Sequence, residues 1–128
     1  MNVILSIKPQ FVQEIVAGRK RFEFRKKTFK QPVDKVYVYS SAPVCKLVGE
    51  FSLCSIISGC PTIVWRQTSK FAGISKSFFD DYFLGKSIAY ALKIGEFKAY
   101  KKPIDANSVI SNFTPPQSYR YVEDLDLK

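Results

Sequence analysis

Hydrophobic and polar residues alternate over several short stretches of this chain, and a period of two residues is typical of β-strands. The first stretch, which contains Val3 and Leu5, is rich in β-branched residues and ends at Pro9. Turn-forming residues separate the later stretches. The pattern predicts strands over residues 2–7, 20–25, 34–40, 46–57 and 86–99, and a short last strand over 119–122.

Other stretches have apolar residues at helical spacing. Residues 9–17 combine such spacing with Pro9 at the first turn and Gly18 as a C-terminal stop, and residues 62–70 and 75–84 predict two more helices as an insertion between strands. Within the apolar stretch 46–57, Gly49 predicts a bulge or a point of close approach. This order of elements predicts an α+β fold, a small mixed or antiparallel β-barrel with helices at its periphery.

A length of 128 residues corresponds to one domain. We expect residues 1–122 to form that single domain and the acidic residues 123–128 to form a C-terminal tail that frays. The first residues resemble a strand instead of a signal peptide, and no apolar stretch approaches the length of a membrane span. We therefore expect a cytoplasmic protein without membrane contact.

The chain has no histidine, which removes the usual neutral-pH general base and the commonest zinc ligand. The three cysteines, Cys45, Cys54 and Cys60, lack the spacing of a metal site, and we interpret them as small core residues of a reduced protein. No phosphate-binding loop or dinucleotide motif is present. We expect no metal and no cofactor.

Twenty Lys and Arg against eleven Asp and Glu give a net charge of +9, which favours a polyanionic partner. Much of the excess lies in residues 19–30, where Glu23 is the only acid. On a strand, Glu23 and Arg25 point to the same face, where an ion pair would orient the guanidinium towards a phosphate or a base edge. Lys20, close to Gly18, adds a mobile point charge.

Gly18, Lys20, Glu23 and Arg25 form the pattern G-x-K-x-x-E-x-R, which resembles the signature of the ASCH superfamily. The segments ILSIKP, VYVYSSAPV, VGEF, AYALKI and PPQSYRY also resemble stand-alone ASCH proteins of bacteria, archaea and phages, so the resemblance covers nearly the whole chain. It implies a PUA-like mixed β-barrel of about five or six strands with two or three peripheral helices.

The resemblance also implies a cleft, lined by the motif residues, that binds RNA or a modified nucleoside. A loop after the strand 34–40 would border this cleft and offer backbone amides to an anion. Tyr37, Tyr39, Tyr90, Tyr119 and Trp65 are candidates for stacking on bases, although most aromatic rings must lie in the core. The candidate binding residues are Gly18, Lys20, Glu23, Arg25, Ser40 and Ser41.

The favoured hypothesis is a protein that binds single-stranded RNA or a nucleotide-like ligand, with a role in RNA-linked regulation. The alternative is a hydrolase that uses Lys20 and Glu23 in the same cleft, either an acylated-cytidine amidohydrolase or a metal-independent ribonuclease. Glu23 occupies the place where the amidohydrolases of the family carry threonine. A carboxylate there should also keep Lys20 charged, which favours binding. A third alternative is that the basic face docks an acidic protein.

Overall fold

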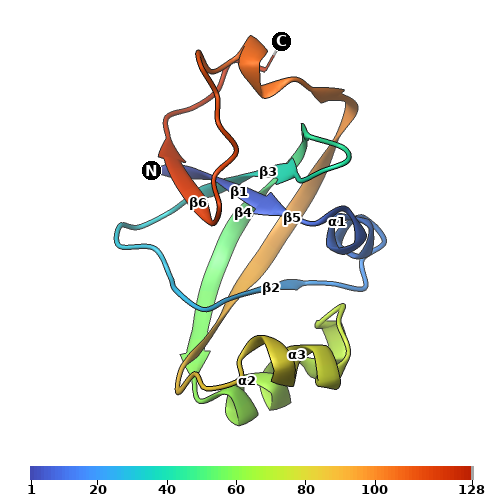
Figure 1. The fold of residues 1–128 in the computed structure, drawn as a ribbon, viewed down its shortest axis with the longest axis vertical. Helices are drawn as coiled ribbons and strands as arrows, with labels where there is room; N and C mark the ends of the chain where they lie inside the picture. The colour runs from blue at the N-terminus through green and yellow to red at the C-terminus, as the bar shows by residue number, and fades with distance from the viewer. Residues whose placement is uncertain (128) are drawn as a thin grey trace.

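The computed structural model describes residues 1–127, which form a six-stranded sheet, three α-helices and two 3-10 turns (Figure 1). The helical elements are α1 (Pro9–Val16), α2 (Pro61–Thr68), η1 (Ser69–Phe71), α3 (Lys76–Tyr82) and η2 (Ala106–Ser108). The strands are β1 (Asn2–Ile7), β2 (Phe22–Arg25), β3 (Lys35–Ser40), β4 (Lys46–Gly59), β5 (Ala89–Ile104) and β6 (Tyr119–Val122).

The strands form one curled sheet in the order β2-β5-β4-β3-β1-β6, with β2 and β6 at its two edges. β1 pairs in parallel with β3, and the other neighbours pair antiparallel. Figure 1 shows α1 beside the sheet and the insertion of α2, η1 and α3 at the far end of the long β4–β5 hairpin. The α+β class and the mixed half-barrel with peripheral helices confirm the prediction from the hydrophobic pattern.

β1 shows why the first stretch of the chain is almost continuously apolar. Val3 and Leu5 face the cluster that also contains Val12 and Ile15 of α1, whereas Ile4 faces a second cluster on the opposite side of the sheet. Because side chains alternate between the two faces of a strand, a strand buried on both faces needs apolar residues at successive positions. A third cluster lies under the insertion and includes Phe24 and Phe79.

The predicted boundaries differ from the structure by one to five residues at β2, β3, β4 and β5. β5 runs to Ile104, beyond the predicted end at residue 99, because Leu47 of β4 still pairs with Ile104. The stretch predicted over 20–25 contributes only Phe22–Arg25 to the sheet, and Lys20 instead forms an isolated antiparallel bridge with Ala72 of the insertion. Pairing with distant segments decides where β5 ends and where β2 begins. The local alternation of apolar and polar residues contains no information on such pairing.

The prediction that the cysteines lie in the core is wrong, since Cys45, Cys54 and Cys60 are all exposed free thiols. Cys45 follows a turn with a positive φ of 54°, and Cys60 precedes α2. Cys54 lies on β4 in the part where burial of the strand is incomplete. Their small apolar character therefore does not indicate burial here.

The described part of the acidic tail packs against the sheet, which differs from the expected fraying. The side-chain amide of Asn2 donates to Asp124 Oδ1 at 2.6 Å, and the backbone N–H of Leu125 donates to the Tyr37 hydroxyl at 3.0 Å. Leu125 and Leu127 also contact the cluster around Tyr37. The division into a domain over 1–122 and a tail over 123–128 stays a prediction. Among residues 1–127, no helix is long and apolar enough to cross a membrane.

The predicted bulge at Gly49 is present, because the β4–β5 register shifts between Leu47 and Gly49. A Cβ at Gly49 would lie 2.5 Å from Phe97 Cζ and 2.7 Å from the Lys98 carbonyl oxygen. A Cβ at Gly59, in the same strand, would meet its nearest neighbour, in Val64, at 3.8 Å.

We expect Gly49→Ala to lower the free energy of unfolding by about 1–3 kcal/mol, because the backbone of β5 would have to move away. Gly59→Ala, the matched control, should change it by less than about 0.5 kcal/mol. Urea denaturation followed by circular dichroism measures both values. Equal effects of the two substitutions would contradict the close approach at Gly49.

Candidate functional site

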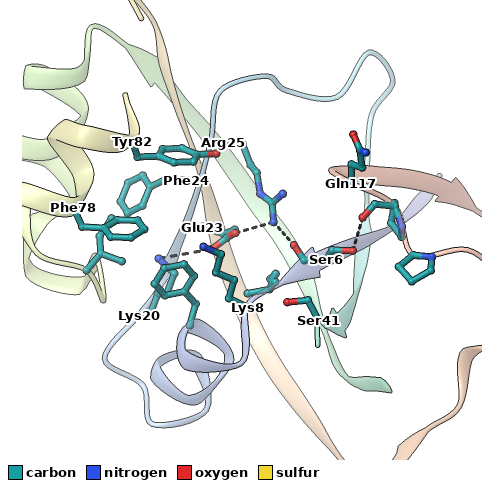
Figure 2. A pocket seen from close by; sticks show the side chains of 15 residues that line it. Ser6, Lys8, Lys20, Glu23, Phe24, Arg25, Ser41, Phe78, Tyr82 and Gln117 are labelled. Carbon is teal, nitrogen blue, oxygen red and sulfur yellow. Dashed lines mark hydrogen bonds and ion pairs between the residues drawn. The ribbon is translucent and has the colours of Figure 1, made fainter. Parts of the chain in front are cut away.

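A cleft of about 420 Å³ opens between the end of β1, the start of α1, β2, α3 and the segment before β6 (Figure 2). The topology brings these segments together, because β2 and β6 are the two edges of the curled sheet and the β4–β5 hairpin carries the insertion alongside. Side chains from five separate stretches of sequence therefore line one cavity.

The walls of the cleft are largely aromatic and apolar. Phe24 comes from β2, Phe11 from α1, and Phe78 and Tyr82 from α3, with Ile74 beside them. Phe11 and Phe78 meet edge to face with ring centroids 5.4 Å apart. Phe78 nevertheless remains 39% exposed, so its ring is available to a ligand. Such walls suit a flat, apolar group.

Glu23 lies at the floor of the cleft between two cations. Its Oε2 accepts a hydrogen bond from Arg25 Nη2 at 2.8 Å, and its Oε1 lies 3.7 Å from Lys20 Nζ. Glu23 is only 6% exposed and Lys20 only 2%. Because two cations share one carboxylate, the group carries one excess positive charge when Lys20 is protonated. This charge can interact with an anion that enters the cleft.

Arg25 also links β2 to the opposite side of the cleft. Its Nη2 donates to the carbonyl oxygen of Ser6 at 2.8 Å, and the Ser6 hydroxyl donates to the carbonyl oxygen of Pro116 at 2.7 Å. Arg25 Nε is buried and has no hydrogen-bond partner. Such an unsatisfied charged donor is costly inside a protein, and a ligand acceptor would relieve the cost.

Lys20 is not the mobile point charge that its position after Gly18 suggested. Its Nζ donates to the carbonyl oxygen of Ala72 at 2.8 Å and lies 4.8 Å from the centroid of the Phe24 ring. Burial lowers the pKa of Lys20, and this effect outweighs the opposing influence of Glu23. Glu23 does raise the pKa of Lys20, as the sequence suggested, but the net shift is downward because the whole side chain is buried, and this burial was not visible in the sequence.

A comparison with known protein families finds a match over most of the chain. The ASCH domain model matches residues 5–111. This chain belongs to the ASCH domain family. An ASCH domain-containing ribonuclease of Zymomonas mobilis is 28% identical over 125 residues, which are 94% of this chain and 84% of that protein. The large ribosomal subunit protein uL22 of Ureaplasma parvum is 33% identical over 124 residues, which cover 95% of this chain but 39% of that protein.

Solved structures of the ASCH family share the fold. A crystal structure of the ASCH protein from Zymomonas mobilis matches with a TM-score of 0.87 and 27% sequence identity, covering 95% of this chain and 87% of that one. A serine-to-alanine mutant of the same protein matches with a TM-score of 0.86 and 27% identity, covering 95% of this chain and 88% of that one. The half-barrel of this chain is therefore the PUA-like fold of ASCH proteins.

The structure of this ASCH domain brings together only some of the residues predicted for the site. Lys20, Glu23 and Arg25 meet in the cleft, and Ser41 lines it. Ser40 is the buried last residue of β3 and does not line it. Gly18 also lies outside the lining, and its φ of +80° serves the turn after α1.

None of the aromatic residues proposed for base stacking lines the cleft. Tyr37 and Tyr39 are buried in the cluster on the opposite face of the sheet. Phe24 of β2 lines the cleft, together with Phe11, Phe78 and Tyr82, which the sequence assigned only to helices. Their clustering with Phe24 depends on how α1 and α3 pack, which cannot be predicted from the spacing of residues within each helix. Among residues 1–127, no group of three or more Cys, Asp or Glu side chains is arranged to hold a metal ion.

We expect Glu23→Gln to lower the free energy of unfolding by about 2–3 kcal/mol, because it leaves two cations facing each other in a nearly buried place. Glu14→Gln is the matched control, since Glu14 pairs with Arg19 at 2.6 Å on the surface, where solvent screens the charges. The control should leave the stability nearly unchanged. Urea denaturation at neutral pH tests both, and a Glu23→Gln variant as stable as the wild type would contradict the buried arrangement.

Proposed function

We propose that this ASCH protein binds single-stranded RNA and takes one nucleotide into the cleft. The observation that carries the proposal is the combination of aromatic walls with a buried cationic floor in one cavity of about 420 Å³. That volume falls in the range of small-molecule sites. Sequence-tolerant RNA binding commonly uses aromatic rings for the bases and cations for the backbone.

The polar groups at the floor support a nucleotide rather than a purely apolar ligand. The Glu23 carboxylate can accept from the donor edge of a base, and Arg25 Nε is a buried donor that lacks an acceptor. The ring of Phe78 offers an exposed surface on the opposite wall. A base can therefore find both stacking and hydrogen-bonding partners in the cleft.

Exposed lysines beside the cleft support contacts with the RNA backbone. Lys8 lines the opening, and Lys26 lies 4.7 Å from the centroid of the Tyr82 ring. The loop that continues from Lys26 is attached to β6, because the Tyr121 hydroxyl accepts from the backbone N–H groups of Lys30 and Gln31. In the described part of the chain, none of these lysines is paired with a carboxylate. Phosphates are suitable partners for them.

The comparisons with known proteins support a function related to RNA. The Zymomonas mobilis relative that spans nearly the whole chain is named a ribonuclease. For this chain, the name favours RNA over the acidic protein partner that the net charge alone leaves open.

Cleavage of the bound RNA is the second candidate function, and the buried Lys20 beside Glu23 favours it. The RNA 2′-hydroxyl oxygen would attack the adjacent phosphorus while its proton passes to Glu23. The bond from phosphorus to the 5′-oxygen would break, and Lys20 would donate a proton to that oxygen, leaving a 2′,3′-cyclic phosphate and a 5′-hydroxyl. A lowered pKa makes Lys20 a better proton donor. The Arg25 guanidinium would stabilise the negative charge on the phosphoryl oxygens in the transition state.

Hydrolysis of acylated cytidine is less well supported than RNA cleavage. The family resemblance places a threonine of the amidohydrolases where this chain has Glu23, so the hydroxyl nucleophile is missing at that position. Thr28 lies too far along the chain to replace it and does not line the cleft.

We expect Phe78→Ala to weaken binding of a short fluorescein-labelled single-stranded RNA by about tenfold, since one stacked base contributes about 1–3 kcal/mol. Phe71→Ala is the matched control, because Phe71 is equally exposed, at 38% against 39%, in the same insertion but outside the cleft. Fluorescence anisotropy measures both affinities. Equal losses in the two variants, or no RNA binding by the wild type, would contradict the proposal.

If the protein cleaves RNA by the route described, turnover should continue in excess EDTA and end in a 2′,3′-cyclic phosphate. Lys20→Met should reduce the rate by about 100-fold or more, the usual contribution of a general acid. Lys76→Met, a surface lysine that pairs with Asp80, is the control and should retain the wild-type rate. Gel analysis of labelled RNA gives rates and products. Loss of turnover with EDTA, or full activity of Lys20→Met, would exclude this mechanism.

A further inference from the structure

The segment that joins η1 to α3 runs directly alongside Lys20. Lys20 and Ala72 form an isolated antiparallel bridge, and the backbone N–H of Arg21 donates to the Phe71 carbonyl oxygen at 2.8 Å. The Arg21 guanidinium also stacks over the Phe71 ring at 4.2 Å. The insertion therefore contacts the residues just before β2 through its backbone, in addition to supplying a wall of the cleft.

Gly73 is the point of closest approach between this segment and the Lys20 side chain. A Cβ at Gly73 would lie 2.7 Å from Lys20 Cγ and 3.0 Å from Cδ, and nearer still to Cβ. Gly73 also has a φ of +67°, which favours glycine by itself. Two independent constraints thus act on position 73, namely the backbone conformation and the space occupied by the lysine stem.

The close approach determines what surrounds the Lys20 ammonium. The carbonyl oxygen of Ala72, the residue before Gly73, is its hydrogen-bond acceptor at 2.8 Å, and Glu23 lies farther away at 3.7 Å. The rings of Phe11 and Phe24 cover it at 5.4 and 4.8 Å. The charged groups that influence it are Glu23 and Arg25 of β2 and Glu14 of α1. A neutral carbonyl and aromatic rings therefore hold an ammonium that would otherwise approach Glu23.

We propose that Gly73 is a positioning residue for Lys20: the missing side chain lets the lysine stem lie against the insertion, so that Ala72 and not Glu23 holds the ammonium. Any side chain at position 73 would displace the stem and move the ammonium towards the open cleft and Glu23. In that position it is better hydrated and closer to a carboxylate, and both changes raise the pKa of Lys20. The consequence for RNA rests on the proposed function, but the placement of Lys20 does not.

Gly85 provides a matched control for Gly73. It lies in the same insertion with a φ of +78°, and a Cβ there would meet nothing within 4 Å. Gly73→Ala and Gly85→Ala therefore impose the same kind of backbone strain, and only Gly73→Ala contacts Lys20.

The test is an NMR titration of protein labelled with 13C at lysine Cε, in which the Lys20 signal is identified by its loss in Lys20→Met. Lys20 of the wild type should titrate at lower pH than the surface lysines. Gly73→Ala should move its titration to higher pH, and Gly85→Ala should leave it unchanged. An unchanged titration in Gly73→Ala would overturn the proposal. A purely structural role of Gly73 would lower stability without this shift.

If Gly73→Ala does not fold, the double variant Lys20→Gly with Gly73→Ala replaces it. Glycine at position 20 removes every atom that the new Cβ would meet in Lys20, so only the backbone strain of alanine at a positive φ remains. The double variant should therefore fold, with a urea midpoint below that of Lys20→Gly by no more than Gly85→Ala lowers the midpoint of the wild type. A double variant that also fails to fold would overturn the proposal.

RNA binding by the same variants separates this inference from the proposed function. If the wild type binds RNA, Gly73→Ala should bind it more tightly than Gly85→Ala does, because its Lys20 ammonium is charged to higher pH and lies nearer the open cleft. If the wild type does not bind RNA but the titration shifts as expected, the proposed function fails and the positioning role of Gly73 stands.

Discussion

The side chain of Arg25 connects the two sides of an open half-barrel, and the cleft depends on this connection. β2 is one edge of the sheet, and β1 lies next to the other edge. Arg25 reaches from β2 to the carbonyl oxygen of Ser6, just beyond the last register pair between β1 and β6, while the same Nη2 donates to Glu23. A charged hydrogen bond to a backbone acceptor thus joins strands that share no ladder.

Placing three charged groups at this floor costs free energy, because each loses hydration. Glu23 offsets part of the cost by contacting both cations, and Ala72 offers a carbonyl to Lys20. Two features show that part of this free-energy cost is not offset. Arg25 Nε is a buried donor without an acceptor, and burial lowers the pKa of Lys20. A bound anion or base would relieve both features, and both lie in the same cleft. Such local conflicts are expected at functional sites.

The helical insertion contributes to the cleft in two ways. α3 supplies the aromatic wall, with Phe78 and Tyr82, and the segment before α3 confines Lys20 through Ala72 and Gly73. Its own cluster, which includes Phe79 and Phe83, anchors it on β2 and β5 through Phe24 and Ala91. Phe24 therefore has contacts in both the cluster and the cleft. The packing that stabilises the insertion is the same packing that orients the wall of the site.

The sequence by itself determined the elements, their order, the family and the motif of Lys20, Glu23 and Arg25, because period-two and helical spacing and a short motif are local properties. It also placed Glu23 and Arg25 on one face, which follows from strand geometry. Tertiary structure decided features that local spacing does not encode. Lys20 is buried against Ala72, Phe11 and Phe78 line the cleft, and Ser40 does not line it. The pKa of Lys20 is the clearest case. Its neighbour Glu23 was visible in the sequence, but the desolvation that outweighs Glu23 depends on how distant segments pack. Ala72 of the insertion and the ring of Phe11 both contact the buried ammonium.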